Sequence, residues 1–310
     1  MANHRLSREL AIETMRIYNT YNRNLGMCMR MTKIPRTTMQ SRLRTIKVQF
    51  PDLYLNDNSD HRIKWTYPQQ EQVEFSDGVV LIGSDAHIWP GEWSIMMKAF
   101  SQISRQLKPK AIVLNGDIID GARVSRHGSL LRSYAPKITD EIDAAREWIE
   151  TLPPTEHCIW TMGNHDQRVD TYLANNAPEL DDYAGTIADR FKDWKFCWAV
   201  NINNVEIRHR FRSGIHAGWN NALHAGLTIV TGHTHQLQMT AVRNRNGTHW
   251  GIECGMLGEP NSRAFEYSEG APNRANPGFV VLTFVDDQLL PPEFCELING
   301  RPVFRGEFIF

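Results

Sequence analysis

The sequence contains few cysteines, and its apolar runs are short. The cysteines are odd in number, and no two of them are close in the chain of 310 residues. They are Cys28, Cys158, Cys197, Cys254 and Cys295. This spacing argues against a disulfide framework or a zinc knuckle and favours a reducing compartment. The longest apolar candidate, residues 278–285, has the length of a strand, whereas a membrane helix needs about 18 residues.

We also expect no signal peptide, because no apolar stretch follows the polar first residues. We therefore expect a cytoplasmic protein with no membrane partner. Hydrophobic residues make up 41% and charged residues 22% of the chain, which is ordinary for a soluble globular protein. A chain of this length can bury a sizeable core.

Charge is distributed unevenly along the chain. Residues 1–50 carry ten Lys and Arg against two acidic residues, Glu9 and Glu13, and so sum to +8. The other 260 residues carry 24 basic and 33 acidic groups and sum to −9. A basic segment on an acidic body suggests that the segment binds a polyanion. A solvated helical face would carry the same charge, and charge alone does not choose between the two.

The first part of the chain has helical periodicity. Residues 6–48 show apolar positions at three-to-four spacing, broken at Pro35, and a third helix is expected to begin near Thr37 or Thr38. Residues 49–77 are polar and proline-containing, which indicates a linker with room for one short strand. We expect a helical domain over 1–48, a linker over 49–77 and an α/β domain over 78–310.

Strand-like and helical patterns alternate from residue 78 onward. This alternation predicts βαβ units and a largely parallel sheet. The strand-like runs are 79–82, 111–114, 158–161, 205–208 and 227–230. After residue 236 the chain is β-rich, with a hairpin turn predicted at 243–247.

Polar residues that can bind metals follow each of these strands. They are Asp85 and His87, then Asp117, then Asn164, His165 and Asp166, then His209, and finally His233 and His235. Sites in α/β sheets form outside the carboxyl ends of strands, so five strand ends are expected to converge on one crevice. Carboxylate, imidazole and amide ligands together suit Mn, Fe or Zn rather than Ca.

In order, these segments have the patterns D-x-H, G-D, G-N-H-D, a lone His and G-H-x-H, and they resemble the calcineurin-like metallophosphoesterase superfamily. The match spans residues 85–235, about half of the chain. The resemblance implies an α/β/β/α sandwich with two facing mixed sheets, here preceded by the small helical domain. It also implies a dinuclear, metal-dependent phosphoesterase in which a hydroxide that bridges the metals attacks phosphorus.

The ligand scheme of that family implies two divalent ions, with Mn expected first and Fe, Zn or Ni as alternatives. One ion would be held by Asp85, His87 and His235. The other would be held by Asn164, His209 and His233, and Asp117 would bridge both. His165 matches the catalytic histidine that is not a ligand, and Asp166 is expected to orient it.

The fourth segment departs from the family pattern, which has His-Gly where this chain has His209 and Arg210. His216 and His224 are rivals for the ligand, but neither follows a strand, so His209 is favoured. Asp120 and His127 follow the second segment; we expect a helix cap and a surface histidine, respectively, rather than pocket residues.

Residues 34–43 resemble a helix-turn-helix of the Fis type. The turn would lie at about residues 32–36, and the recognition helix would cover 37–47. Its exposed face would carry Arg36, Thr37, Gln40, Ser41 and Arg44, residue types that can contact bases and phosphates. Lys33 and Thr32 depart from the motif, and a basic three-helix unit can also dock a protein. The charge favours nucleic acid.

Residues 271–310 resemble the tail of phage-encoded and related bacterial members of the superfamily, and are expected to supply strands that complete the second sheet. If the chain is phage-encoded, it would act in the cytoplasm of a bacterial host. The resulting hypothesis is a phosphodiesterase or nuclease that the helical domain brings to DNA. The alternatives are a phosphomonoesterase acting on a phosphoprotein or nucleotide, and a DNA-binding regulator with a phosphoesterase scaffold.

Overall fold

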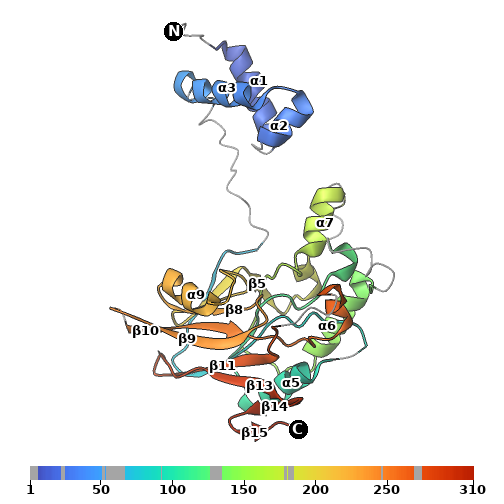
Figure 1. Cartoon of the computed structure of the whole chain (residues 1–310), viewed down its shortest axis with the longest axis vertical. Coiled ribbons are helices and arrows are strands. Elements are labelled where there is room, and N and C mark those ends of the chain that lie inside the picture. The colour runs from blue at the N-terminus through green and yellow to red at the C-terminus, as the bar shows by residue number, and fades with distance from the viewer. Residues whose placement is uncertain are drawn as a thin grey trace. The chain divides into compact units, whose positions relative to one another are not determined.

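The chain divides into two compact units, Met1–Thr66 and Tyr67–Phe310 (Figure 1). The computed structural model describes residues 6–21, 25–50, 53, 67–91, 93–125, 135–177, 180, 185–245, 247–268 and 274–310. Much of the expected linker, and His127, therefore lie outside the described residues.

The described residues of the first unit form the helices α1 (Arg8–Thr20), α2 (Leu25–Thr32) and α3 (Arg36–Gln49), in agreement with the periodicity. The Ser7 hydroxyl caps α1 by accepting a hydrogen bond from the Leu10 backbone N–H at 3.2 Å. Ala11 and Met15 of α1 pack on Ile46 of α3, which forms a small core. Because this core is small, much of each helix surface stays exposed.

The turn between α2 and α3 occupies residues 33–35. Lys33 has φ +58°, a left-handed conformation that costs a residue other than glycine about 1 kcal/mol or more. Pro35 then sits at the N-cap of α3, where its missing N–H costs nothing. The helix begins at Arg36, one residue before the predicted start.

The larger unit contains two mixed sheets. Within the described residues, the larger sheet has nine strands in the order β15-β14-β13-β11-β2-β3-β4-β5, with β12 beside β11. Its parallel strands are β2 (Gly78–Gly83), β3 (Ala111–Leu114), β4 (His157–Thr161) and β5 (Lys195–Cys197). Its antiparallel strands are β11 (Gly278–Val285), β12 (Gln288–Leu289), β13 (Glu293–Ile298), β14 (Arg301–Phe304) and β15 (Glu307–Phe308).

The smaller sheet has six described strands in the order β1-β6-β7-β8-β10-β9. They are β1 (Glu71–Val73), β6 (Ala199–Ile202), β7 (Val205–Arg208), β8 (Thr228–Thr231), β9 (Leu237–Asn244) and β10 (Gly247–Cys254). β9 and β10 pair antiparallel, with Asn244 opposite Gly247, in agreement with the predicted hairpin.

The two sheets face each other across a shared apolar core. Val80 and Ile82 of β2 pack in it with Ile207 of β7. Since neighbouring side chains of a strand point to opposite faces, Leu81 instead lies in a second core, with Phe100 of α5 (Ile95–Leu107) and Trp148 of α6 (Ile138–Ile149). Figure 1 shows α5 beyond β11 and β13, on the side away from β9 and β10.

A helix also covers the smaller sheet. Ala222 of α9 (Ala217–Ala225) packs on Ile229 of β8 and Val242 of β9. The order of layers is therefore helix, sheet, sheet, helix, as the resemblance implies. Shorter elements lie around the ends of the sheets: η1 (Ala122–Val124), α7 (Arg168–Asn176), η3 (Ile187–Arg190) and η4 (Arg263–Ser268). No described helix is both long and apolar enough to span a membrane.

One expectation about chain organisation needs correction. The strands after residue 277 do not complete the second sheet, because β11 pairs with β2 and so extends the sheet that β2 begins. The range 49–77 contains one short strand, as the sequence allowed: β1 pairs in parallel with β6, Glu71 opposite Val200. Tyr67 is also buried in the larger unit, beside Phe196 and Trp198.

Candidate metal centre

The candidate ligands lie where strands from both sheets end. Three of the sequence segments follow β2, β3 and β4 of the larger sheet, and the other two follow β7 and β8 of the smaller sheet. The crevice is thus built between two sheets rather than at the edge of one parallel sheet, which the alternation of strands and helices did not reveal.

Left-handed backbone turns bring the side chains together. Positive φ values are found at Asp85 (53°), His87 (43°), Asp117 (52°), His233 (71°) and His235 (58°). Each such conformation costs a residue other than glycine about 1 kcal/mol or more. Strain of this kind gathers at functional sites, where the surrounding fold holds it.

Glycines make room for this arrangement. A Cβ at Gly163 would lie 2.1 Å from the Asp117 Oδ1, and a Cβ at Gly116 would lie 2.5 Å from the His209 ring. A Cβ at Gly232 would lie 2.1 Å from the Ser84 Oγ. The glycines of the sequence segments are therefore required by packing against the acidic and imidazole side chains themselves.

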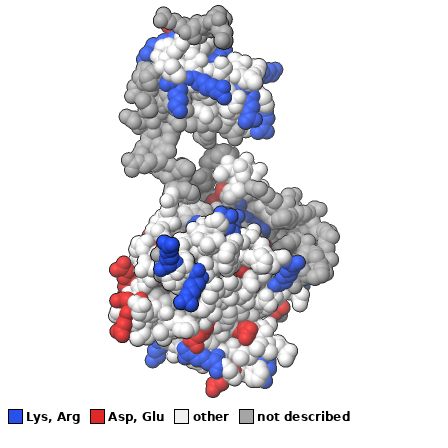
Figure 2. Space-filling view, turned by 60° about the vertical axis from the view of Figure 1, so that its left-hand side comes forward, with Lys and Arg blue, Asp and Glu red and all other residues white. Residues whose placement is uncertain are grey.

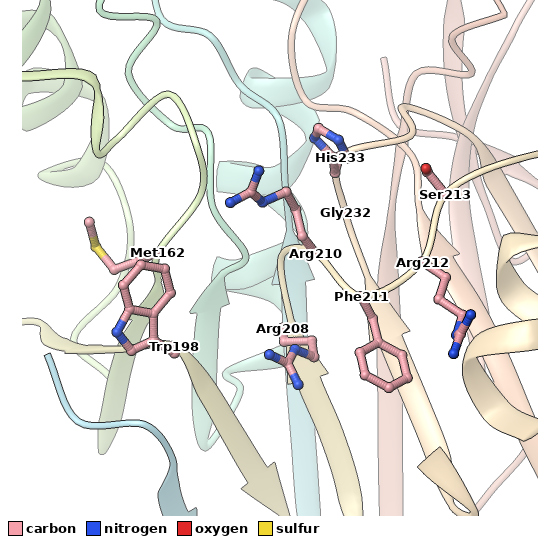
Figure 3. Close-up of a pocket in the computed structure, with 9 residues that line it drawn as sticks. All are labelled: Met162, Trp198, Arg208, Arg210, Phe211, Arg212, Ser213, Gly232 and His233. Carbon is pink, nitrogen blue, oxygen red and sulfur yellow. The ribbon is translucent and has the colours of Figure 1, made fainter. Parts of the chain in front are cut away.

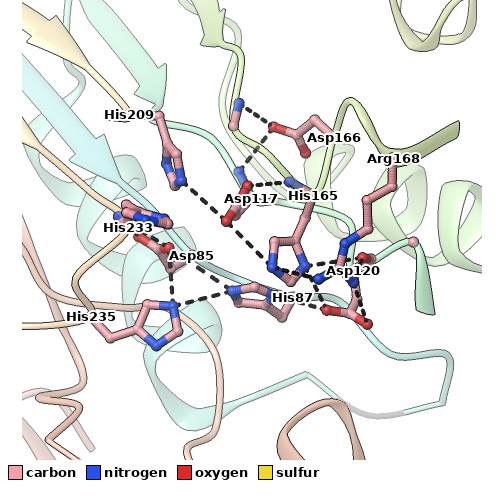
Figure 4. A network of polar contacts seen from close by, with 12 residues as sticks. Asp85, His87, Asp117, Asp120, His165, Asp166, Arg168, His209, His233 and His235 are labelled. Carbon is pink, nitrogen blue, oxygen red and sulfur yellow. Dashed lines mark hydrogen bonds and ion pairs between the residues drawn. The ribbon is translucent and has the colours of Figure 1, made fainter. Parts of the chain in front are cut away.

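Asp85, His87 and His235 form a first cluster able to hold a metal ion (Figure 4). The His235 Nε2 lies 3.2 Å from the Asp85 Oδ1, and the two histidine Nε2 atoms lie 3.4 Å apart. The His87 Nε2 is 3.9 Å from the same carboxylate oxygen. Two ring nitrogens and one carboxylate oxygen thus converge, as in the ligand sets of Mn, Fe or Zn.

A second cluster contains Asp117, His209 and His233. The His209 Nε2 lies 3.1 Å from the Asp117 Oδ2, and its Nδ1 lies 2.8 Å from the Asn115 carbonyl oxygen. A hydrogen bond from Nδ1–H to that carbonyl leaves Nε2 free to act as a ligand.

One buried polar atom beside this cluster, the Asn164 Oδ1, has no hydrogen-bond partner among the described residues. Buried polar atoms are almost always paired, so this oxygen needs an explanation. A cation would satisfy it, and would also bind the His209 Nε2, whose described polar contact is the Asp117 carboxylate. The carboxylate, imidazole and amide donors present therefore fit a divalent metal ion.

Nearby carboxylates favour the charged form of His209 in the second cluster. Burial disfavours a charged His209, yet the carboxylates of Asp117 and Asp85 outweigh it and raise the pKa of His209 to about 9. Partial burial, together with the charge on His209, lowers the pKa of His233 to about 4. A divalent cation would take over this interaction with the carboxylates and release the His209 proton.

His165 stands beside the clusters, held by Asp120. The His165 Nδ1 lies 2.9 Å from the Asp120 Oδ1, while its Nε2 lies 3.8 Å from the Asp117 Oδ2. The same Asp120 oxygen is 3.0 Å from the His87 Nδ1. Burial disfavours the charged ring of His165, but Asp117 and Asp120 raise its pKa above the ordinary value.

The expectation that Asp166 orients His165 is wrong. The Asp166 carboxylate accepts hydrogen bonds from the backbone N–H groups of Asp117 and Gly163, both at 2.9 Å, and from the Trp160 indole at 3.1 Å. It therefore fastens the loop after β3 to the loop after β4. Burial and the Asp117 charge raise the pKa of Asp166 to about 6.

Asp120 was expected to cap a helix, and it is instead the carboxylate that contacts both His165 and His87. The signal that could have identified it is its position three residues after Asp117, in the same loop after β3. His216 and His224 are both exposed, at the start and near the end of α9, and neither lies in a described cluster that could hold a metal.

The residues expected to contact nucleic acid lie in the other unit. Arg36, Thr37, Ser41 and Arg44 are exposed on α3, and Gln40 is half-buried. Met39 and Ile46 of the same helix are buried. The polar row therefore occupies the outer face of α3.

Residues 78–237 match the family described as calcineurin-like phosphoesterase. The gene 54 protein of Mycobacterium phage L5 is 25% identical over 251 residues, covering 72% of this chain and 94% of that protein. The gene 54 protein of Mycobacterium phage D29 is 26% identical over 257 residues, with the same coverage. A crystal structure of a Vps29 single mutant from Entamoeba histolytica covers 75% of this chain and 99% of its own, at 14% identity and a TM-score of 0.41. The family match spans half of the chain and contains the five segments that build the crevice, so the chain belongs to the calcineurin-like phosphoesterase family and is a metal-dependent phosphoester hydrolase.

Proposed function

We propose that the protein is a phosphodiesterase that cleaves nucleic acid, DNA in particular. The observation that carries this proposal is that one chain joins the two ligand clusters to a basic helical unit. Figure 2 shows many Lys and Arg side chains and little acidic surface on the visible face of that unit. A basic surface of this kind binds the phosphate backbone through charge, whatever the base sequence.

The metal centre is proposed to hold two divalent ions, with manganese favoured by the mixture of carboxylate, imidazole and amide donors. Asp85, His87 and His235 would hold one ion, and Asn164, His209 and His233 the other, with Asp117 between them. Such a pair of ions, when bound, polarises the phosphoryl oxygens and activates water.

The remaining side chains of the centre position the substrate and move a proton. His165 is the proposed acid: Asp120 holds its Nδ1, so that Nε2 faces the cluster and can protonate the leaving oxygen. Asp166 is proposed to act indirectly, by fixing the loop that carries Asp117. A guanidinium nitrogen of Arg168 lies 2.9 Å from the His165 Nε2 and can only donate to it, so this contact must give way to the substrate before Nε2 can carry the proton.

The helical unit is proposed to deliver the substrate. α2, the turn at residues 33–35 and α3 would form a helix-turn-helix, in which Arg36, Thr37, Gln40, Ser41 and Arg44 contact DNA. The left-handed Lys33 supports this arrangement, since it stands where such motifs often have glycine. The phage relatives support a site of action in the cytoplasm of a bacterial host.

The proposal is tested by Mn²⁺-dependent hydrolysis of bis(p-nitrophenyl) phosphate, p-nitrophenyl phosphate and labelled DNA, side by side. We expect turnover of the diester and of DNA, abolished by Asp117→Asn. Turnover of the monoester alone would instead indicate a phosphatase. DNA binding without hydrolysis of any substrate, with metal bound, would indicate a regulator built on a phosphoesterase scaffold.

A further inference from the structure

A pocket of about 380 Å³ opens beside the second ligand cluster. His233, a proposed ligand, lines it together with Gly232, so the pocket borders the reacting centre (Figure 3). The rest of its wall comes from the end of β7 and the loop that follows it, and from the ends of β4 and β6. These residues are Met162, Trp198, Arg208, Arg210, Phe211, Arg212 and Ser213.

The pocket is strongly basic. Arg208, Arg210 and Arg212 line it, and no described lining residue is acidic. Arg208 pairs with Glu206 through one nitrogen at 3.0 Å, but its buried Nε has no hydrogen-bond partner among the described residues. The guanidinium groups of Arg210 and Arg212 form no ion pair within the described part of the chain. The pocket thus presents uncompensated positive charge to an anion.

An aromatic ring lies among these arginines. Phe211 is 41% exposed, although a phenyl ring normally seeks burial. The Arg208 guanidinium lies 5.2 Å from the ring centroid, which holds one face of the ring in place. Figure 3 shows Phe211 between Arg208 and Arg212. Arginines that alternate with an exposed aromatic are typical of surfaces that bind single-stranded nucleic acid.

Arg210 also lines a second pocket, of about 360 Å³, together with Asn164 and Arg168. It therefore stands between the two pockets that border the centre, at the position where the family pattern has glycine. One phosphoryl group at the metals would not need guanidinium groups spread over both pockets. A chain of successive phosphates would need guanidinium groups in both.

Resting on the proposed function, we propose that the pocket binds the nucleotide next to the scissile phosphate in a single-stranded nucleic acid. Arg210 and Arg212 bind the neighbouring phosphate, and Phe211 stacks on the unpaired base. A duplex would not offer that base, because its faces are already stacked. The substrate class is therefore a single strand or a frayed end, rather than an intact duplex.

The test compares kcat/KM of the full chain with Mn²⁺ for a short single-stranded oligonucleotide, the same sequence as a duplex, and bis(p-nitrophenyl) phosphate, which has no neighbouring nucleotide. Arg210→Ala and Arg212→Ala should each lower kcat/KM for the single strand about tenfold more than for the small diester. Phe211→Ala should lower the single-strand value by about tenfold. Each arginine variant should also reduce the slope of log kcat/KM against log salt by about 0.7.

Arg243→Ala is the matched control, since Arg243 is an exposed arginine near the far end of β9, and it should match wild type on all three substrates. The helical unit is present in every variant, so its contribution cancels when the kcat/KM of a variant is divided by that of wild type for the same substrate. Equal losses on the oligonucleotide and the small diester, or duplex cleaved as fast as single strand, would overturn the proposal while leaving the phosphodiesterase function intact. Wild type that cleaves only monoesters would overturn both.

Discussion

One carboxylate, Asp120, serves two imidazoles of the centre. Its Oδ1 lies 2.9 Å from the Nδ1 of His165 and 3.0 Å from the Nδ1 of His87. Arg168 donates a hydrogen bond to the Asp120 backbone carbonyl at 2.7 Å and so fixes the backbone that carries this carboxylate. Asp120 therefore couples the orientation of a proposed ligand to that of the proposed acid.

Asp120→Asn is predicted to lower kcat by about 10- to 100-fold, the usual effect of losing a carboxylate behind a metal-ligating histidine. An asparagine oxygen can still accept from both rings, so the geometry survives and only the charge is lost. The charge of Asp120 helps to raise the pKa of His165, against burial. Because the acid must be protonated, the alkaline limb of the pH–rate profile should move to lower pH in the variant.

The control for that variant is Asp143→Asn, which removes an exposed carboxylate of α6 that pairs only with Arg146 in the described contacts. It should leave both kcat and the pH profile as in wild type. A profile for Asp120→Asn that coincides with wild type would show that the carboxylate does not act on His165.

At the scale of residues, the sequence predicted which side chains gather in the two clusters better than it predicted the carboxylates that contact them. His209 lies in a cluster as predicted; it directly follows β7, one of the strands that end at the crevice. Asp120 contacts His165 in the way expected of Asp166, and Asp166 instead joins the loops after β3 and β4. Adjacency in sequence suggested that Asp166 orients His165, but the tight turn aims its carboxylate back at Trp160 and the backbone of Asp117. Such side-chain directions follow from the three-dimensional turn and not from spacing.

At the scale of elements, the strands were predictable from apolar runs, but their partners were not. Residues 79–82 and 227–230 were both predicted as strands from apolar runs, yet β2 and β8 belong to different sheets. A buried strand is apolar on both faces wherever it lies, so its sequence does not encode which sheet it joins. The same limit explains why β11 was assigned to the wrong sheet.

One helix also supports the centre through a buried acid. Glu141 of α6 accepts hydrogen bonds from the backbone N–H of Gly121 at 2.6 Å and of Ala122 at 3.2 Å, at the start of η1. This contact ties α6 to the loop that carries Asp120. Burial, followed by the charge of Asp120, raises the pKa of Glu141 to about 8.

The folded state should therefore hold a proton on Glu141 between pH 4.5 and about 8, where the unfolded chain has lost it. The contribution of this group to stability is complete below pH 4.5 and is lost as pH rises toward 8, by on the order of a few kcal/mol. Glu141→Gln cannot titrate, so its free energy of unfolding should fall less than that of wild type from pH 5 to pH 8. Urea unfolding in EDTA at several pH values measures the difference.

Glu147→Gln provides the comparison on the same helix, because Glu147 is exposed. Its stability should follow the wild-type pH dependence throughout. Parallel curves for wild type and Glu141→Gln would mean that Glu141 is ionised in the folded protein already at pH 5.

At the scale of the whole molecule, charge is divided unevenly between the two parts of the chain. The basic residues are concentrated in the first 50 positions, which sum to +8, while the other 260 sum to −9. An acidic body repels nucleic acid at long range, so a basic unit in the same chain would supply the attraction. The composition of the sequence revealed this division before any element was known.

The boundary between the units decides how they can be separated. Tyr67 is buried beside Phe196 and Trp198, and β1 pairs with β6, so residues 67–77 belong to the larger unit. A truncation at residue 77, where the apolar pattern begins, would remove an edge strand. A truncation after Thr66 would leave the larger unit whole.

Deleting residues 1–66 is predicted to weaken DNA binding by at least tenfold while leaving hydrolysis of bis(p-nitrophenyl) phosphate within about twofold of wild type. The physical reason is that the basic unit no longer neutralises phosphates of the DNA. The slope of log affinity against log salt should therefore become shallower, by about 0.9 for each duplex phosphate that is no longer neutralised. Fluorescence anisotropy at several salt concentrations measures both effects.

Two double variants of the full chain separate a specific surface from general charge. Arg36→Ala with Arg44→Ala, in the outer row of α3, should reproduce most of the effect of the deletion on DNA affinity. Arg16→Ala with Arg30→Ala removes the same charge from α1 and α2 and should have a smaller effect. Equal effects of the two pairs would mean that the helical unit attracts DNA only through its overall charge. DNA binding unchanged by the deletion would mean that the helical unit does not deliver the substrate.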